Sequence, residues 1–203
     1  MKNNFLLVDS YKEHFGVNFD KSKKVEVVII DKELFVKEFE FTSGKQLKNF
    51  FHKDIKVAFE TAKFLFHYEI IKSRNKIKLI LYGINAADKL KEIWQKYKVK
   101  KVLPIQYLLV YAVKKVSKES RFVVIYSLKE SLYIVDVEHG HIQYNRLFKM
   151  YKQDKIDLGV LLNYSQYDRK KPLYVIKQQN EVIVDIEDVY EFKSIERETI
   201  NVP

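Results

Sequence analysis

Residues 76–116 read KIKLILYGINAADKLKEIWQKYKVKKVLPIQYLLVYAVKKV, and this stretch decides the fold. It begins with a run, residues 76–82, in which every second side chain from Ile77 to Leu81 is apolar, the period that is typical of a strand. Residues 99–103 form a second short run of the same kind. Because a helical pattern follows each run, the stretch predicts the order strand–helix–strand–helix of an α/β fold.

The first of the two predicted helices follows Asn85, which is its expected N-cap. Asp88 lies in the first turn, where a negative charge favours the positive end of a helix. The apolar side chains have the spacing of an amphipathic helix: Ala86, Leu90, Ile93, Trp94 and Tyr97. Since Trp94 and Tyr97 are in phase with the aliphatic positions, the pattern favours core positions for both over a base-stacking platform.

The second predicted helix begins at Pro104, because the first helical position does not need an N–H group. Its expected core face consists of Ile105, Leu108, Leu109, Ala112, Val113 and Val116. Further along, the sequence predicts strands at 121–126, 131–137 and 141–147, a helix at about 154–164, and closing strands at 173–176 and 182–186. Gly140 can take positive φ in the turn between the second and third of these strands.

Before residue 76 the sequence is mostly strand-like. Strands are expected at 5–9, 14–19, 25–30 and 34–41, joined as antiparallel hairpins because the connections are short. Ser43 and Gln46 form a capping-box pattern at the start of a helix, and further strands are expected at 55–59 and 64–70. The change of pattern predicts two subdomains with mixed sheets and flanking helices, residues 1–75 and 76–203, without an independent linker.

The composition is that of a globular protein, with 47% hydrophobic residues, 14 Tyr and 14 Phe in 203 residues. Without Cys, the chain can form neither a disulfide framework nor a thiolate metal site. Only 5 Gly are present, which disfavours a glycine-rich phosphate loop. No apolar run reaches the roughly 20 residues that span a bilayer, and the N-terminal apolar stretch is too short for a signal peptide, so we expect a cytoplasmic protein.

The net charge of +10 is carried largely by short lysine-rich runs at 21–24, 96–101, 114–115 and 169–171. Each run falls at a predicted loop or element end, where solvated turns are the simplest interpretation. Attraction to an acidic protein, to anionic lipid or to nucleic acid is the alternative, and charge alone does not choose among them.

Three passages resemble the actin-like assembly proteins of type IV pilus and type II secretion machines, the family of PilM, the cytoplasmic domain of GspL and BfpC. They are residues 76–82 with the following helix, residues 99–104 with the helix that runs to Lys115, and residues 122–146. The last passage resembles the family's second phosphate-loop hairpin, whose strand here carries Arg146. The resemblance implies a reduced actin-like (ribonuclease-H-like) fold with two subdomains.

The same hairpin departs from ATP-binding relatives, in which a carboxylate orients metal and water and a glycine lets the backbone approach a phosphate. Tyr126 stands in place of the Asp, and Leu128 in place of the Gly. The first loop keeps Asp9, but Tyr11 would crowd a phosphate turn and no glycine occurs before Gly16. The resemblance to GspL and BfpC implies absence of ATPase activity, whereas PilM-like relatives keep nucleotide. Because both loops depart from the ATP-binding pattern, we expect a protein without a nucleotide cofactor and without enzyme activity.

Acidic residues on predicted strands leave nuclease chemistry open as an alternative. A ribonuclease-H-type enzyme needs three or four acids around two Mg²⁺ ions, and Asp9, Asp136 and Asp185 are the strand-borne candidates. The simpler interpretation is that Asp9 caps a turn and Asp136 points to solvent.

Histidines give no stronger indication of a site. His139 and His141 flank Gly140 close to Glu138, but two His around a hairpin glycine are more typical of turn residues than of a metal site. The other three are isolated in sequence: His14, His52 and His67. We therefore assign no catalytic, cofactor-binding or metal residue, and the sequence does not identify partner-contact residues.

These observations, together with the resemblance, predict a non-catalytic adaptor at the cytoplasmic face of the inner membrane. By resemblance, its partners are the pilus or secretion assembly ATPase and the membrane-platform proteins, and binding would use a sheet edge or an inter-subdomain groove. An anionic membrane surface and a homodimer are left open as further partners. The alternatives are an actin-like ATPase or nuclease of the same fold, and a nucleic-acid-binding module, which requires one continuous basic face.

Overall fold

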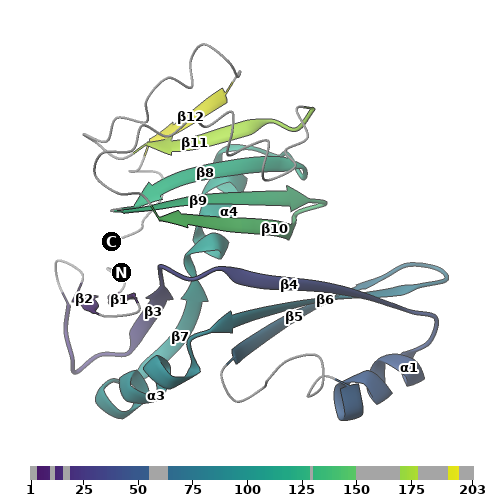
Figure 1. The fold of residues 1–203 in the computed structure, drawn as a ribbon, viewed down its shortest axis with the longest axis horizontal. Helices are drawn as coiled ribbons and strands as arrows, with labels where there is room; N and C mark the ends of the chain where they lie inside the picture. Colours follow the sequence, from purple (N-terminus) through teal and green to yellow (C-terminus); the bar gives the residue numbers. More distant parts are fainter. Residues whose placement is uncertain are drawn as a thin grey trace.

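The computed structural model in Figure 1 describes residues 4–9, 12–15, 19–54, 64–128, 130–149, 170–177 and 192–196. Three sheets form its framework. The first, sheet A, has the order β2-β1-β3-β7 and contains β1 (Phe5–Val8), β2 (Glu13–Phe15), β3 (Val25–Ile29) and β7 (Val99–Pro104). β2 is antiparallel to β1, whereas β1, β3 and β7 are parallel, so β7 lies at an edge of this sheet.

Sheet B is antiparallel, with the order β4-β6-β5. It consists of β4 (Leu34–Phe41), β5 (Phe64–Lys72) and β6 (Ile77–Asn85), so that β5 is an edge strand. Between β4 and β5 the chain forms helix α1 (Gly44–Asn49) and a π-helical turn, η1 (Phe50–Asp54). Helix α3 (Ala87–Lys96) then connects sheet B to β7.

Sheet C has the order β10-β9-β8-β11-β12. Its strands are β8 (Phe122–Leu128), β9 (Ser131–Glu138), β10 (His141–Lys149), β11 (Leu173–Lys177) and β12 (Phe192–Glu196). Every residue of β8 is buried, as expected for a central strand that is covered on both faces. Helix α4 (Ile105–Val116) leads from β7 into this sheet.

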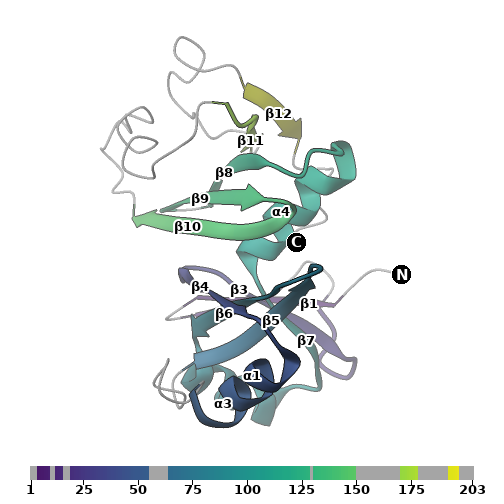
Figure 2. The same ribbon diagram turned by 90° about the vertical axis from the view of Figure 1, so that its right-hand side faces the viewer.

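The sheets form two halves, with sheets A and B below and sheet C above in Figures 1 and 2. Helix α4 rises from the lower half and lies against sheet C. Buried residues from all three sheets join one continuous core. Asn145 of β10 ties the halves together, because its side chain accepts a hydrogen bond from Leu34 N (2.9 Å) and donates one to Leu34 O.

The chain passes from the lower to the upper half at Pro104, where β7 ends and α4 begins. β5 and β6 lie on opposite sides of the predicted boundary but pair along their whole length, and β7 joins the first sheet beside β3. Of the hairpins expected between consecutive strands at the start of the chain, that of β1 and β2 is confirmed. Those expected of β3 with β2 and with β4 were wrong, since β3 pairs in parallel with β1 and β7. A run rich in β-branched residues, such as Val25–Ile29, suits a strand that is buried on both faces better than a hairpin strand with one face in solvent.

Three expectations for the helices were wrong in detail. Asn85 is held in β6 opposite Phe64, so Ala86 becomes the N-cap of α3 without a side-chain hydrogen bond. Pro104 is the N-cap of α4 instead of its first residue. Trp94 and Val116 were expected in the core but are 48% and 50% exposed.

Other predicted elements are present near their expected bounds. In the turn before β10, Gly140 has the positive φ expected (80°), and His139 also has a positive φ, 50°, which was not predicted. β12 was not predicted, because residues 192–196 have neither an apolar run nor strict alternation. The strands expected at 55–59 and 182–186 and the helix at 154–164 lie outside the described residues. In the described parts of the chain, no helix is long and apolar enough to cross a membrane.

Candidate functional site

Two turns face each other where the halves meet, one after β1 and one between β8 and β9. They border a hollow of about 340 Å³, which is at the small end of the range for ligand sites. Its lining comes from both halves: Asp9, Lys12, His14, Ile30, Asp31, Leu128, Glu130, Ser131, Tyr133 and Lys149. This is the position at which the sequence predicted degenerate phosphate loops.

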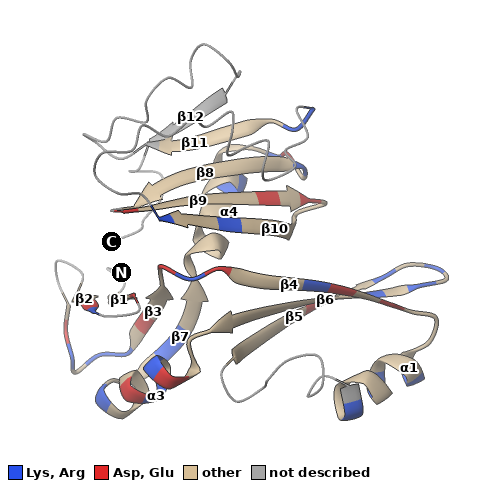
Figure 3. Cartoon of the chain, in the orientation of Figure 1, with Lys and Arg blue, Asp and Glu red and all other residues tan. Residues whose placement is uncertain are grey.

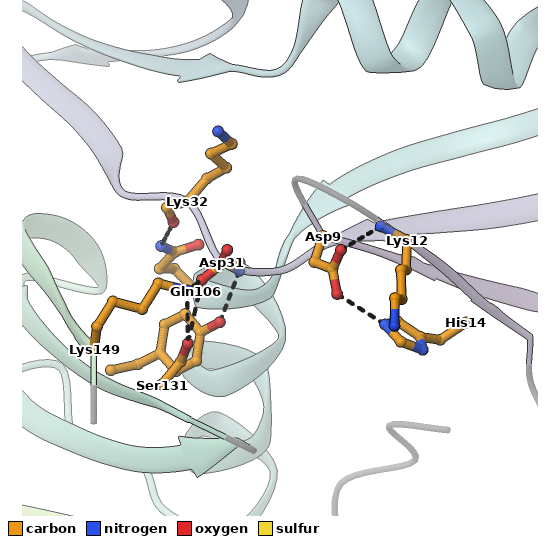
Figure 4. A network of polar contacts seen from close by, with 9 residues as sticks. Asp9, Lys12, His14, Asp31, Lys32, Gln106, Ser131 and Lys149 are labelled. Carbon is orange, nitrogen blue, oxygen red and sulfur yellow. Dashed lines mark hydrogen bonds and ion pairs between the residues drawn. The ribbon is translucent and has the colours of Figure 1, made fainter. Parts of the chain in front are cut away.

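Asp9 lies on the lower side of the hollow, at the end of β1. Its carboxylate accepts a hydrogen bond from Lys12 N (2.5 Å), and its second oxygen is 2.8 Å from His14 Nε2 (Figure 4). The register of β1 and β2 explains the pair, since Leu7 is opposite His14 and Asp9 follows two residues later on the same face. The predicted turn-capping role of Asp9 is confirmed, but its pairing with His14 was missed.

Asp31 links the two halves beside this pair. Its backbone N–H donates to Tyr133 Oη (2.8 Å), while its carboxylate accepts from Ser131 Oγ (3.3 Å) and forms an ion pair with Lys149 (Figure 4). Asp31 has a φ of 65°, a left-handed conformation that Asp tolerates better than most residues. The protein's own side chains therefore bridge this part of the junction.

Tyr126 and Leu128 stand on the face of β8 that is turned toward the core. Tyr126 is buried and stacks on Tyr133 with 6.3 Å between ring centroids, and Leu128 is buried at the end of the strand. Burial raises the pKa of Tyr133, so its hydroxyl stays protonated and can act as a hydrogen-bond donor or acceptor. The bulky side chains at the predicted phosphate hairpin are thus packed parts of the core.

The remaining candidate acids do not gather at this junction. Asp136 does not point to solvent as predicted but pairs with Lys171 Nζ (2.5 Å), which also contacts Glu138 (2.9 Å). Burial lowers the pKa of Lys171, but the bonds to the two carboxylates outweigh it and raise the pKa overall. Asp185 lies outside the described residues.

The histidines are dispersed over separate elements. His141 contacts Glu69 of β5, whereas His139 is exposed and lies 3.6 Å from Glu138. Within the described ranges, no group of three or more His, Asp or Glu side chains is placed to hold a metal ion. His139 lies in the turn with Gly140, whereas His141 is the first residue of β10.

A larger groove of about 590 Å³ lies in the lower half, on the side of sheet B that faces β7 and α3. It runs between two edge strands, β5 and β7. Its lining is mostly apolar, with two lysines: Leu34, Leu65, Phe66, His67, Tyr82, Ile84, Trp94, Val99, Lys100, Lys101, Val102, Leu103, Pro104 and Tyr107.

Two aromatic residues in this groove have properties of a binding site. Trp94, the single Trp of the chain, is 48% exposed on α3. The hydroxyl of Tyr107 is buried, with no hydrogen-bond partner in the part of the chain that the structure describes, which costs free energy unless a ligand supplies one. One signal for this site was present in the sequence, the Trp on a predicted helix, but its periodicity favoured a core position.

Charged residues of both signs are interspersed over the lower half and sheet C in Figure 3. Many lysines are paired with acids, including Lys76 with Glu40 (2.8 Å) and Lys100 with Glu26 (2.6 Å).

No protein-family model matches the sequence, and no curated protein does. The structure, however, is similar to the cytoplasmic domain of EpsL, an inner-membrane component of the type II secretion system of Vibrio cholerae, with a TM-score of 0.55 and 12% identity. The similarity covers 95% of this chain and 88% of that one.

Two further structures are similar at comparable levels. A Bacteroides thetaiotaomicron protein with an actin-like ATPase fold and unknown function has a TM-score of 0.52 and 14% identity, over 99% of this chain and 93% of that one. The PilM–PilN type IV pilus biogenesis complex has a TM-score of 0.50 and 11% identity, over 75% and 62%. These likenesses confirm the predicted α/β, actin-like fold.

Proposed function

We propose that this protein is a non-catalytic adaptor of a type II secretion or type IV pilus assembly platform, acting at the cytoplasmic face of the inner membrane. In this role it binds an extended segment of a membrane-platform protein in the groove between β5 and β7 and also contacts the assembly ATPase. The likeness to EpsL and to the PilM–PilN complex supports the class of machine.

The observation that carries the proposal is the groove between two strand edges. In the described residues β5 and β7 have no partner on their outer sides, so each presents backbone N–H and C=O groups to a peptide. Apolar side chains and Trp94 line the space between them, and Lys101 favours a segment with an acidic residue.

The hairpin junction supports a non-catalytic role. Leu128 and Tyr126 are packed where a phosphate-binding relative has open backbone, and the Asp31–Lys149 ion pair crosses the junction. Both features leave less room and less free positive charge for a polyphosphate.

Overlapping synthetic peptides from the cytoplasmic segments of the platform proteins of the same organism test the binding role. A bound peptide should cover Trp94 and shift its emission to shorter wavelength, and calorimetry should give the same affinity. Replacing Lys101 by Glu should weaken an acidic peptide, whereas Lys118→Glu, an exposed lysine beyond α4, is the matched control. If no peptide shifts the emission or gives heat, the proposed binding role is wrong.

Titration with ATP and Mg²⁺ tests the non-catalytic role separately. We expect no change in melting temperature at millimolar ATP, because a bound ligand would stabilise the folded state by mass action. Micromolar binding that is lost in Asp9→Asn would replace the adaptor by an actin-like ATPase. A pull-down with the assembly ATPase should retain that partner, and its failure would remove the ATPase from the proposal.

A further inference from the structure

We propose that the outer face of sheet B is a docking surface for an anionic lipid bilayer. The outer face is defined by the side chains of β4 and β5 that share the face of Phe35 by register: Phe35, Lys37, Phe39, Phe41, Phe64, Phe66, Tyr68, Ile70 and Lys72. It meets the groove at Phe66, which also belongs to the groove lining, and the inference does not depend on the peptide-binding role.

The register of the sheet places these residues on one side. Phe35 and Phe66 are both opposite Gly83 of β6, and Lys37 and Tyr68 are both opposite Leu81. Directly opposed residues of an antiparallel pair share a face. Because Gly83 has no side chain, the aromatic rings can approach each other over the central strand, and the rings of Phe35 and Phe64 meet edge to face at 5.2 Å.

Among the residues that the structure describes, helix α1 and turn η1 cover one end of the outer face. Phe50 packs on Phe39 (4.5 Å between centroids), and Phe51 packs on Tyr68 (4.9 Å). Large apolar area nevertheless stays in contact with solvent, since Phe35 is 47%, Tyr68 50% and Ile70 39% exposed. Exposed aromatic residues gathered on one side of a sheet indicate an interaction surface.

The charges of the two strands are sorted between the two faces. The acids of β4 and β5 all lie on the opposite face, where Glu38 pairs with Lys78, Glu40 with Lys76, and Glu69 with His141. The charged side chains that β4 and β5 place on the outer face are both lysines, Lys37 and Lys72. Exposed Lys45 and Lys48 on α1 add to the positive charge on this side of the sheet (Figure 3).

This combination favours a lipid surface as the occupant. Aromatic side chains are stable at the level of the headgroups, where one part of the ring is apolar and the surroundings are polar. Lysines beside them attract anionic lipids, each contributing about fivefold to the partition coefficient. Since the outer-face charges of β4 and β5 have a single sign, they complement an anionic bilayer better than a protein surface of mixed charge.

Sedimentation with lipid vesicles tests the inference on the full chain. The protein should bind vesicles of phosphatidylcholine with about one third phosphatidylglycerol, and should bind pure phosphatidylcholine at least tenfold more weakly. Tyr68→Ser combined with Ile70→Ser should lower binding by about tenfold, because both exposed side chains would lose their insertion into the interface. Tyr111→Ser with Val116→Ser, which removes equally exposed apolar groups from α4, is the matched control and should bind as the wild type does.

Charge reversal of two exposed lysines on α1 tests the contribution of charge to vesicle binding with substitutions that do not alter the folded core. Lys45→Glu with Lys48→Glu replaces exposed side chains and should lower vesicle binding at least tenfold, while Lys115→Glu with Lys118→Glu should change it less than twofold. Trp94 lies on the groove side of sheet B, so vesicles should leave its emission unchanged.

Equal binding to neutral and anionic vesicles, or equal losses of vesicle binding in the outer-face variants and the control variants, would overturn the inference. The inference would also be overturned if this face bound a protein partner and the protein did not bind vesicles at all.

Discussion

The carboxylate of Asp31 and the ammonium group of Lys149 form an ion pair that joins the β3–β4 connection of the lower half to the end of β10 in the upper half. The pair is asymmetric, because the Asp31 side chain is 12% exposed and the Lys149 side chain 50%. A half-exposed partner limits the net contribution of such a pair to folding. Asp31 therefore stabilises the junction through its backbone conformation and hydrogen bonds as much as through charge.

Two substitutions of Asp31 separate these contributions. Asp31→Asn keeps the tolerance for positive φ and a hydrogen-bond acceptor for Ser131, so we expect a loss of only about 0.5 kcal/mol in the free energy of unfolding. Asp31→Ala also places a less tolerant residue at a φ of 65°, and should cost about 2 kcal/mol. Urea unfolding of both variants measures the difference, and equal losses would show that the conformation is not strained.

Asn145 should be more important for stability than any of the charged contacts between the halves. Its buried side chain bonds to both backbone groups of Leu34, and its Oδ1 also accepts from Gln106 Nε2 (3.2 Å). In Asn145→Leu these buried backbone groups would lose their partner, at a cost of about 3 kcal/mol. Thermal unfolding of this variant, with Asn145→Asp as a size-matched comparison, tests the expectation, and a loss below that of Asp31→Asn would contradict it.

Lys171 gives the fold a predictable dependence on pH. The hydrogen bond and charge of Lys171 outweigh the effect of burial and lower the pKa of the Glu138 carboxyl in the folded state. A lowered carboxyl pKa stabilises the fold above the ordinary value near 4.5, and this contribution is lost as the pH falls through the folded-state pKa. Because the pKa of Lys171 is raised, its own contribution is complete below about 10.5 and is lost at higher pH.

Replacing Lys171 by Met should therefore destabilise the protein in a pH-dependent manner. At pH 7 the carboxylates of Asp136 and Glu138 would keep their charge without this partner, at a cost of about 2 kcal/mol. As the pH falls through the folded-state pKa of Glu138, the difference from the wild type should shrink. Calorimetry across this range measures the effect, and Lys118→Met, at an exposed position beyond α4, controls for the loss of a lysine. A difference that is constant from pH 3 to 7 would show that the ion cluster is not its cause.

Local signals in the sequence predicted most of the elements correctly. Ser43 caps α1 by accepting from Gln46 N (3.4 Å), although Gln46 then bonds to Thr42 instead of to Ser43. Gly140 was predicted from the turn alone, because two-residue hairpin turns require positive φ. Such features depend on residues close together in the chain, so the pattern contains what is needed.

The sites depend on residues that are far apart in the chain, and this explains what was missed. The Asp31–Lys149 pair and the groove exist only once β3 and β7 have paired in parallel, and no local pattern specifies that pairing. Trp94 had the periodicity of a core residue, but the turn of α3 that carries it faces the groove. Periodicity identifies a stripe of the helix but does not show where the neighbouring sheet ends.

Tyr107 distinguishes a binding role from a structural one, because the two roles predict opposite results for one substitution. Burial raises the pKa of its hydroxyl, which therefore stays protonated and lies at the groove without a partner in the described part of the chain. Removing an unpaired buried hydroxyl while keeping the ring should leave the free energy of unfolding unchanged or increase it by up to about 1 kcal/mol. If a backbone group of the bound segment instead supplies the missing hydrogen-bond partner of the hydroxyl, Tyr107→Phe should bind the platform peptide about tenfold more weakly. Unfolding and peptide calorimetry on this one variant measure both quantities, with Trp94→Ala as a variant that should lose affinity at little cost to stability. A Tyr107→Phe protein that is destabilised and binds peptide normally would place the hydroxyl in the folding core and remove it from the site.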